Sequence, residues 1–220
     1  MDTDSLIDAL SRRAAPVRPL PRPSVRAVLW LAPGLAIVAG VVVAVKGPFD
    51  PRMVTGDARL AIEQAAMLAT AIGAAVAAFQ STVPGASRRW LWVPAATLAL
   101  WLASVGRGCV DDYLRLGAEG LALGFDSGCV VPAVLIGVVP GVAMVAMLRK
   151  GAPLTPRLTL AFAGLAVAAL ANFGLTLFHI GDVSIMVLVW HFGLIVALSA
   201  TASWLGPRLL AWRGAAEPAV

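Results

Sequence analysis

The sequence predicts an all-α, polytopic membrane protein: a bundle of six transmembrane helices, preceded by a short amphipathic helix, with both termini in the cytoplasm. Of its 220 residues, 60% are apolar and 13% are charged, and the mean hydropathy is +0.87. A soluble domain has about 25% charged residues, so a water-soluble globule is excluded. The apolar residues come in blocks of about 20, the length of a helix that crosses about 30 Å of hydrocarbon. They do not alternate with polar residues, as the strands of a membrane β-barrel would require.

The N-terminal segment, residues 1–24, is polar and is expected to be a separate cytoplasmic unit. Leu6, Ile7 and Leu10 fall on one face of a predicted helix. Charged residues accompany this face in the order that the helix dipole favours, acidic first and basic last: Asp4, Asp8, Arg12 and Arg13. The prolines of residues 16–23 end the helix and make a stiff, extended connector. Because so short a helix is marginal in water, the segment is either a disordered tail or a peptide that folds on a partner.

Six apolar segments predict a transmembrane domain over residues 25–206, followed by a polar cytoplasmic tail over residues 207–220. The expected spans are Val25–Val45, Leu60–Gln80, Trp90–Gly106, Val130–Leu148, Leu158–Phe178 and Val183–Leu205. The third span is the shortest, and Trp90 and Trp92 at its start are expected to anchor it at the membrane surface. The first span is too long for a signal peptide, and no A-x-A-like cleavage site follows it.

The positions of lysine and arginine predict the orientation of the bundle. With the N-terminus in the cytoplasm, twelve of the 17 basic residues lie on the cytoplasmic side and five on the outer side. Short cytoplasmic loops of membrane proteins carry this kind of excess. The membrane therefore explains the basic residues, and no direct contact with nucleic acid is expected.

An outer loop over residues 107–129 is expected between the third and fourth spans, and it holds both cysteines, Cys109 and Cys129. Ends of adjacent antiparallel helices are close enough for a disulfide when the side chains face each other, and an oxidising compartment favours one. Alternatively, the pair senses an oxidant or binds a soft metal ion such as copper, because thiolates select Cu(I). Further metal ligands are available in the outer half of the bundle: His179, His191, Met53 and Met186.

Some polar residues fall inside the predicted spans, where such groups are costly and often functional. Glu63 and Gln64 enter the second span from its outer end. Glu63 is either a helix-end carboxylate in the headgroup region or part of a site. Asn172 lies near the middle of the fifth span and is expected to form an interhelical hydrogen bond.

No motif of an enzyme occurs in the chain. It lacks CxxC, HExxH, GxSxG and P-loop motifs, which carry thiol, zinc, nucleophile and phosphate chemistry. We therefore expect no catalysis and no obligatory cofactor. A redox enzyme that binds haem would need His179 and His191 as ligands. A transporter or channel for a metal ion or small solute would need polar groups from Glu63 and His191 past Asn172 to the inner face, where the spans are apolar.

Several short motifs follow one another along nearly the whole chain. They are TDSLIDALSRRAAPV before the Pro/Arg-rich connector, WLAPGLAI in the first span, DPR in the first outer loop, GCVDDY and DSGCVVPAVLIG around the cysteines, and HIGD and HFGLI near the last span. In this order they resemble the NrsF-type anti-sigma factors, which are bacterial inner-membrane proteins with six predicted spans.

The resemblance implies a regulator with two partners, an extracytoplasmic-function sigma factor and the lipid bilayer. Family members hold the sigma factor at the membrane through cytoplasmic residues and release it when an oxidant or a metal acts on outer cysteines. Carried over, Cys109 and Cys129 are the sensory pair. The candidate contacts to the sigma factor are assigned from amphipathicity and location: Asp4, Leu6, Ile7, Asp8, Leu10, Arg12 and Arg13.

Overall fold

The computed structural model of the chain describes residues 2–13, 19–48, 54, 56–86, 88–121, 123, 130–151, 153–177 and 184–210. Within these ranges every regular element is a helix, which confirms the predicted all-α class. The elements are α1 (Thr3–Arg13), α2 (Pro23–Lys46), α4 (Ala58–Gln80), η1 (Arg88–Leu91), α5 (Trp92–Leu116), η2 (Gly117–Leu121), α6 (Val130–Leu148), α7 (Pro156–Leu175), α8 (Ser184–Val187), η4 (Leu188–Phe192) and α9 (Gly193–Leu209).

Six helices are long and apolar enough to cross a membrane, so the protein is a multi-pass membrane protein. The sixth span runs from Ser184 to Leu209 through α8, η4 and α9, and η4 is a single π-helical turn within it. Five of the six lie within a few residues of the predicted segments, and the third begins where predicted but extends further. The reason is that backbone groups in hydrocarbon must bond within their own segment, so a long apolar block has no alternative to a helix.

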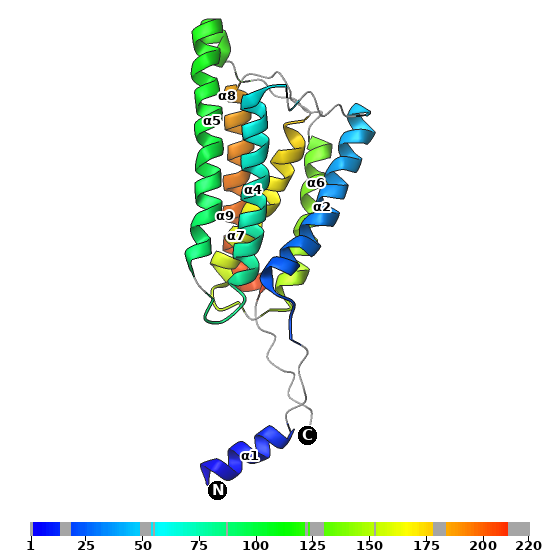
Figure 1. Ribbon diagram of the computed structural model, residues 1–220, viewed down its shortest axis with the longest axis vertical. Coiled ribbons are helices and arrows are strands. Elements are labelled where there is room, and N and C mark those ends of the chain that lie inside the picture. The colour runs from blue at the N-terminus through cyan, green and yellow to red at the C-terminus, as the bar shows by residue number, and fades with distance from the viewer. Residues whose placement is uncertain are drawn as a thin grey trace.

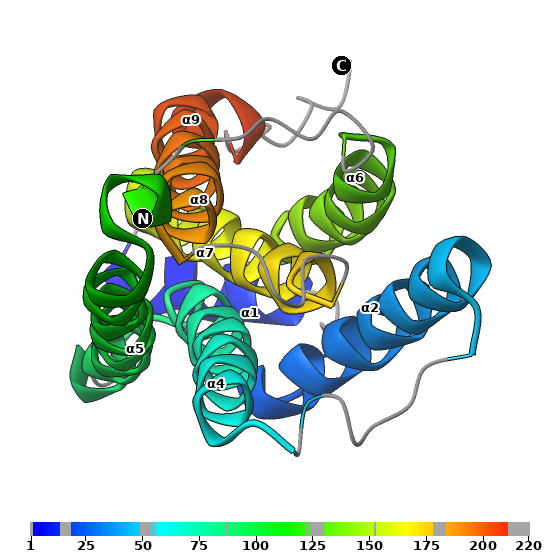
Figure 2. The ribbon, with the colours of Figure 1, turned by 90° about the horizontal axis from the view of Figure 1, so that it is seen from above.

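The helix α7 forms the centre of the bundle, with α2, α4, α6 and α9 arranged around it (Figure 2). Its sequence is rich in alanine and glycine, so neighbouring helices approach it closely. At Gly164, for example, a Cβ atom would lie 2.9 Å from the backbone of Ser199 in α9. The surrounding helices bury the faces that pack on α7 and on one another, and many large apolar side chains on their other faces are exposed.

The bundle has two ends, which differ in what they carry. The helix α2 begins and α9 ends at the same end, and α1 lies beyond the bundle on that side (Figure 1). We call this end the tail side and the opposite end the far side. The tail side also holds the end of α4 and the start of α5, whereas α4 begins and α5 ends on the far side.

The third span is longer than the sequence suggests, and residues 107–121 are helical where a loop was expected. The helix α5 continues to Leu116, and η2 follows to Leu121. The segment RGCVDDYLRL contains no helix breaker strong enough to end α5, although its charges mark the edge of the membrane. The helix ends only at Gly117, which has φ 62° and donates its N–H to the carbonyl of Tyr113. Cys109 therefore lies within a helix, and Cys129 falls outside the described residues.

Candidate functional site

The helix α1 exposes its whole apolar face. Leu6 is 43% exposed, Ile7 57% and Leu10 61%, although all three are large apolar side chains. The polar face carries an ion pair between Asp8 and Arg12, with 3.7 Å between the charged atoms. The predicted helix is thus confirmed from Thr3 to Arg13, and its apolar side chains form a surface of the size that a partner groove can bind.

On the far side, the backbone of α5 beside Cys109 is in tight contact with side chains of two other helices. A Cβ atom on Gly108 would lie 1.9 Å from Nη1 of Arg59 in α4 and 2.4 Å from Oγ of Ser184 in α8. Only glycine leaves room for both groups. The next residue, Cys109, is half-buried and carries a free thiol. Any change in the position of α5 at the thiol therefore acts directly on this contact.

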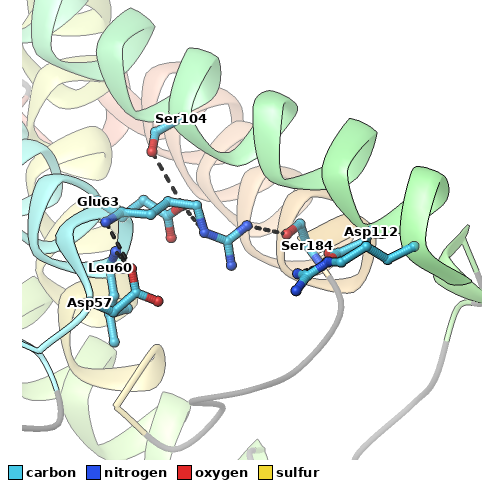
Figure 3. A network of polar contacts seen from close by, with 8 residues as sticks. Asp57, Leu60, Glu63, Ser104, Asp112 and Ser184 are labelled. Atoms are coloured by element: carbon cyan, nitrogen blue, oxygen red, sulfur yellow. Dashed lines mark hydrogen bonds and ion pairs between the residues drawn. The ribbon is translucent and has the colours of Figure 1, made fainter.

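A network of polar contacts links α4, α5 and α8 at this point (Figure 3), and Arg59 of α4 is part of it. Its Nη1 donates a hydrogen bond of 2.8 Å to Oγ of Ser184, and its Nε lies 3.8 Å from Oε1 of Glu63. Ser104 of α5 donates to the same carboxylate oxygen over 3.3 Å. Glu63 is thus part of an interhelical network rather than a solitary helix-end carboxylate, and its ion pair lowers the cost of burying the charge. The N-terminus of α4 is capped separately by Asp57, whose Oδ1 accepts from the N–H of Arg59.

Asp112 attaches the far-side end of α5 to the last span. It lies three residues after Cys109 and so falls on the same side of the helix. Its Oδ2 accepts a hydrogen bond of 2.8 Å from the backbone N–H of Ser184, at the N-terminus of α8, where the helix dipole favours an anion. Its Oδ1 lies 3.5 Å from Nη2 of Arg115. Cys109 therefore lies between two attachment points, Gly108 and Asp112. We call Arg59, Glu63, Ser104, Asp112 and Ser184 the far-side network.

Further polar contacts link α4 and α7, and α7 and η4, next to this network. Gln64 of α4 donates to Oγ1 of Thr176, and Nδ2 of Asn172 donates to the carbonyl of His191 over 3.3 Å. The interhelical hydrogen bond expected for Asn172 is thus confirmed. His191 is buried in η4, seven residues after Ser184, which is roughly 10 Å along a helix. It therefore lies well below the level of Cys109.

The predicted metal ligands are only partly described. Cys129 and His179 fall outside the described residues, as does Met53. Among the residues that the structure does describe, no group of three or more histidine, cysteine and acidic side chains is arranged to hold a metal ion. The set of Cys109, Cys129, His179 and His191 stays a prediction.

A buried charge on the tail side was not anticipated. Arg26 is only 4% exposed, although its position suggested a flanking charge at the membrane surface. Its guanidinium donates to Oγ1 of Thr82 over 3.1 Å and to the carbonyl of Met147, and it lies 4.5 Å from the centre of the Phe79 ring. It therefore fastens the start of α2, which follows the connector from α1, to the tail-side ends of α4 and α6.

These features define a class: a multi-pass membrane protein with an exposed amphipathic helix on one side and a polar network around a thiol on the other. The chain matches the family described as NrsF, negative regulator of sigma F, over residues 10–212 and belongs to it. It is therefore a negative regulator of a sigma factor. No curated protein matches the chain, and no solved structure does. The family match begins at Leu10, so it does not extend over Leu6 and Ile7.

Proposed function

We propose that the protein is a membrane-bound anti-sigma factor of the bacterial inner membrane. Residues 1–24 bind an extracytoplasmic-function sigma factor in the cytoplasm, and residues 25–206 form the transmembrane domain that holds them at the membrane, with residues 207–220 as a cytoplasmic tail. The observation that carries this proposal is the exposed apolar face of α1 in a member of a family of sigma-factor regulators. Burying such side chains on a partner is favourable by about 1.5–3 kcal/mol each.

The distribution of charge supports a cytoplasmic tail side. With the tail side inside, the count along the sequence is twelve of the 17 basic residues on the cytoplasmic side and five on the outer side. This is the asymmetry that positions membrane proteins with their basic loops inside. The far-side network and Cys109 then face the periplasm, where oxidants and metal ions arrive.

The signal, in this proposal, is an oxidant or a soft metal ion that acts on Cys109 and Cys129. Oxidation or metal binding at Cys109 displaces α5 between its two attachment points and so moves Arg59 and Ser184. Arg59 belongs to α4, whose tail-side end leads to Thr82, and Thr82 bonds Arg26 at the start of α2. Couplings between sites are typically about 1–3 kcal/mol, which corresponds to roughly 5–150-fold in affinity for the sigma factor.

Two substitutions in α1 test the binding surface. Leu6→Asp with Leu10→Asp places two charges on the apolar face and should release the sigma factor from the membrane fraction of cells that co-express both proteins. The matched control is Ser5→Asp with Ala9→Asp, which adds the same charge at the same spacing on another face. Retention of the sigma factor by the Leu6/Leu10 variant, or equal release by both variants, would show that the apolar face is not the binding surface.

A transporter or channel for a metal ion or small solute is the alternative. It is less well supported, because the family consists of regulators of a sigma factor. The polar side chains of Gln64 and Asn172 also bond to neighbouring helices. Uptake of metal ions into vesicles by the purified protein would reverse this preference.

A further inference from the structure

An apolar groove runs along the outer surface between α6 and α9, with α7 as its floor. Its volume is about 400 Å³, and it is lined almost entirely by carbon atoms of the three helices. The volume falls within the range of about 300–1,000 Å³ that is common for ligand pockets. The groove faces the lipid, because Val134, Val138 and Val142 beside it are exposed.

Two glycines of α6, Gly137 and Gly141, line this groove at the GxxxG spacing. This spacing usually allows a second helix to approach closely. Here no described atom lies within 4 Å of a Cβ placed on Gly137, and the nearest to one on Gly141 is a methyl group of Val167 at 3.8 Å. Among the described residues, the glycine face of α6 is thus open at Gly137 and only touches α7 at Gly141.

Four basic residues surround the tail-side mouth of the groove. Arg149 and Lys150 directly follow α6, Arg157 is in the first turn of α7, and Arg208 is near the end of α9; all four are exposed. Nε of Arg149 donates over 2.8 Å to the carbonyl of Leu209, which itself lines the groove. None of the ion pairs within the described residues includes these four side chains.

The sequence around the groove offers no counter-ion for these charges. The chain has no Asp or Glu in residues 127–181 or in residues 183–216, which hold α6, α7, α8 and α9. An apolar groove with an uncompensated cationic mouth matches a molecule with a hydrocarbon chain and an anionic head. Basic pockets between transmembrane helices bind lipid headgroups in this way.

We propose that this groove binds one anionic phospholipid. An acyl chain lies against the glycine face of α6, and the phosphate lies beside Arg149, Lys150, Arg157 and Arg208. A second copy of the chain is a poorer occupant. In the same membrane orientation it would bring its own four cations to the same level, and like charges would repel. The proposal does not depend on how the sigma factor is bound.

The test uses the full-length protein, reconstituted in vesicles of phosphatidylcholine with or without phosphatidylglycerol, extracted mildly and examined by native mass spectrometry. We expect one phosphatidylglycerol to stay bound per chain in preference to phosphatidylcholine. Lys150→Gln with Arg157→Gln removes two exposed cations that form no ion pair within the described residues, and it should weaken this retention roughly tenfold or more. Gly137→Leu should abolish retention, because Gly137 lines the groove and a Cβ atom there has open space, so the leucine side chain occupies the place of the acyl chain.

The control is Arg22→Gln with Arg107→Gln, which removes two exposed charges away from the groove and should leave retention unchanged. Equal retention of the two lipids by the wild-type protein would overturn the proposal, because the groove would then take any bilayer lipid. Unchanged retention of phosphatidylglycerol by the Gly137→Leu variant would also overturn the proposal. A dimer that Gly137→Leu dissociates would assign the groove to a second copy of the chain instead.

Discussion

Replacing Gly108 by alanine tests whether α5 is held against α4 and α8 beside Cys109. The new Cβ atom would lie 1.9 Å from Nη1 of Arg59 and 2.4 Å from Oγ of Ser184, so the guanidinium must move and its hydrogen bond to Ser184 is lost. A hydrogen bond to a charged group contributes about 1.5–3 kcal/mol. Alanine gains about 1 kcal/mol over glycine in a helix, so the net loss of unfolding free energy is about 0.5–2 kcal/mol.

Gly106→Ala is the matched control, because it lies in the same helix and a Cβ atom there meets no described atom within 4 Å. It gains the same helix propensity without the clash, so the difference between the two variants isolates the contact at about 1.5–3 kcal/mol. Titration with a denaturing detergent, followed by tryptophan fluorescence, measures both unfolding free energies. If Gly108→Ala is as stable as Gly106→Ala, then α5 is not fastened at Gly108, and the transmission proposed through Arg59 fails with it.

Two further predictions concern the tail side and the thiols. Arg26→Met keeps the apolar stem but loses the hydrogen bonds, so it should lower the unfolding free energy by about 1–3 kcal/mol. The control Arg22→Met, at an exposed residue, should change the unfolding free energy by less than about 0.5 kcal/mol. Equal melting curves for the two variants would contradict this prediction. Cys109→Ser and Cys129→Ser should each abolish the transcriptional response to oxidant and metal in a reporter assay, without loss of sigma-factor retention in unstressed cells. A normal response in both would remove the cysteines from the sensory role.

The six spans were predictable because the membrane leaves the backbone so few options. The end of α5 was not, because the edge of the membrane and the end of a helix are different boundaries. The charges of Arg107, Asp111 and Asp112 indicate the edge of the membrane, and the turn at Gly117 is the end of the helix. A prediction based on hydropathy alone therefore ends the helix at the membrane edge.

The far-side network could not be predicted either, because it depends on how the helices are arranged in space. Arg59 and Ser184 are 125 residues apart in the chain, and Asp112 and Ser184 are 72 apart. The burial of Arg26, in contrast, could have been predicted from its position in the sequence. It begins a row of residues at four-residue spacing that are all buried in α2, continuing with Trp30, Gly34, Val38 and Val42. A charge in register with an apolar stripe predicts burial with partners.

The helix α4 is the element that relates the two ends of the bundle. It is 23 residues long, roughly 35 Å, and it has Arg59 near one end and Thr82 just past the other. Because a packed helix moves as a unit, a displacement at Arg59 reaches Thr82 as a tilt or a shift. Thr82 accepts a hydrogen bond from Arg26, which would carry this movement to the start of α2. Such a movement releases a partner only if the sigma factor binds the two arrangements with different affinity. In the proposed mechanism the apolar face of α1 stays exposed in both arrangements, so the difference in affinity arises from how close the tail-side surface of the bundle comes to the bound sigma factor.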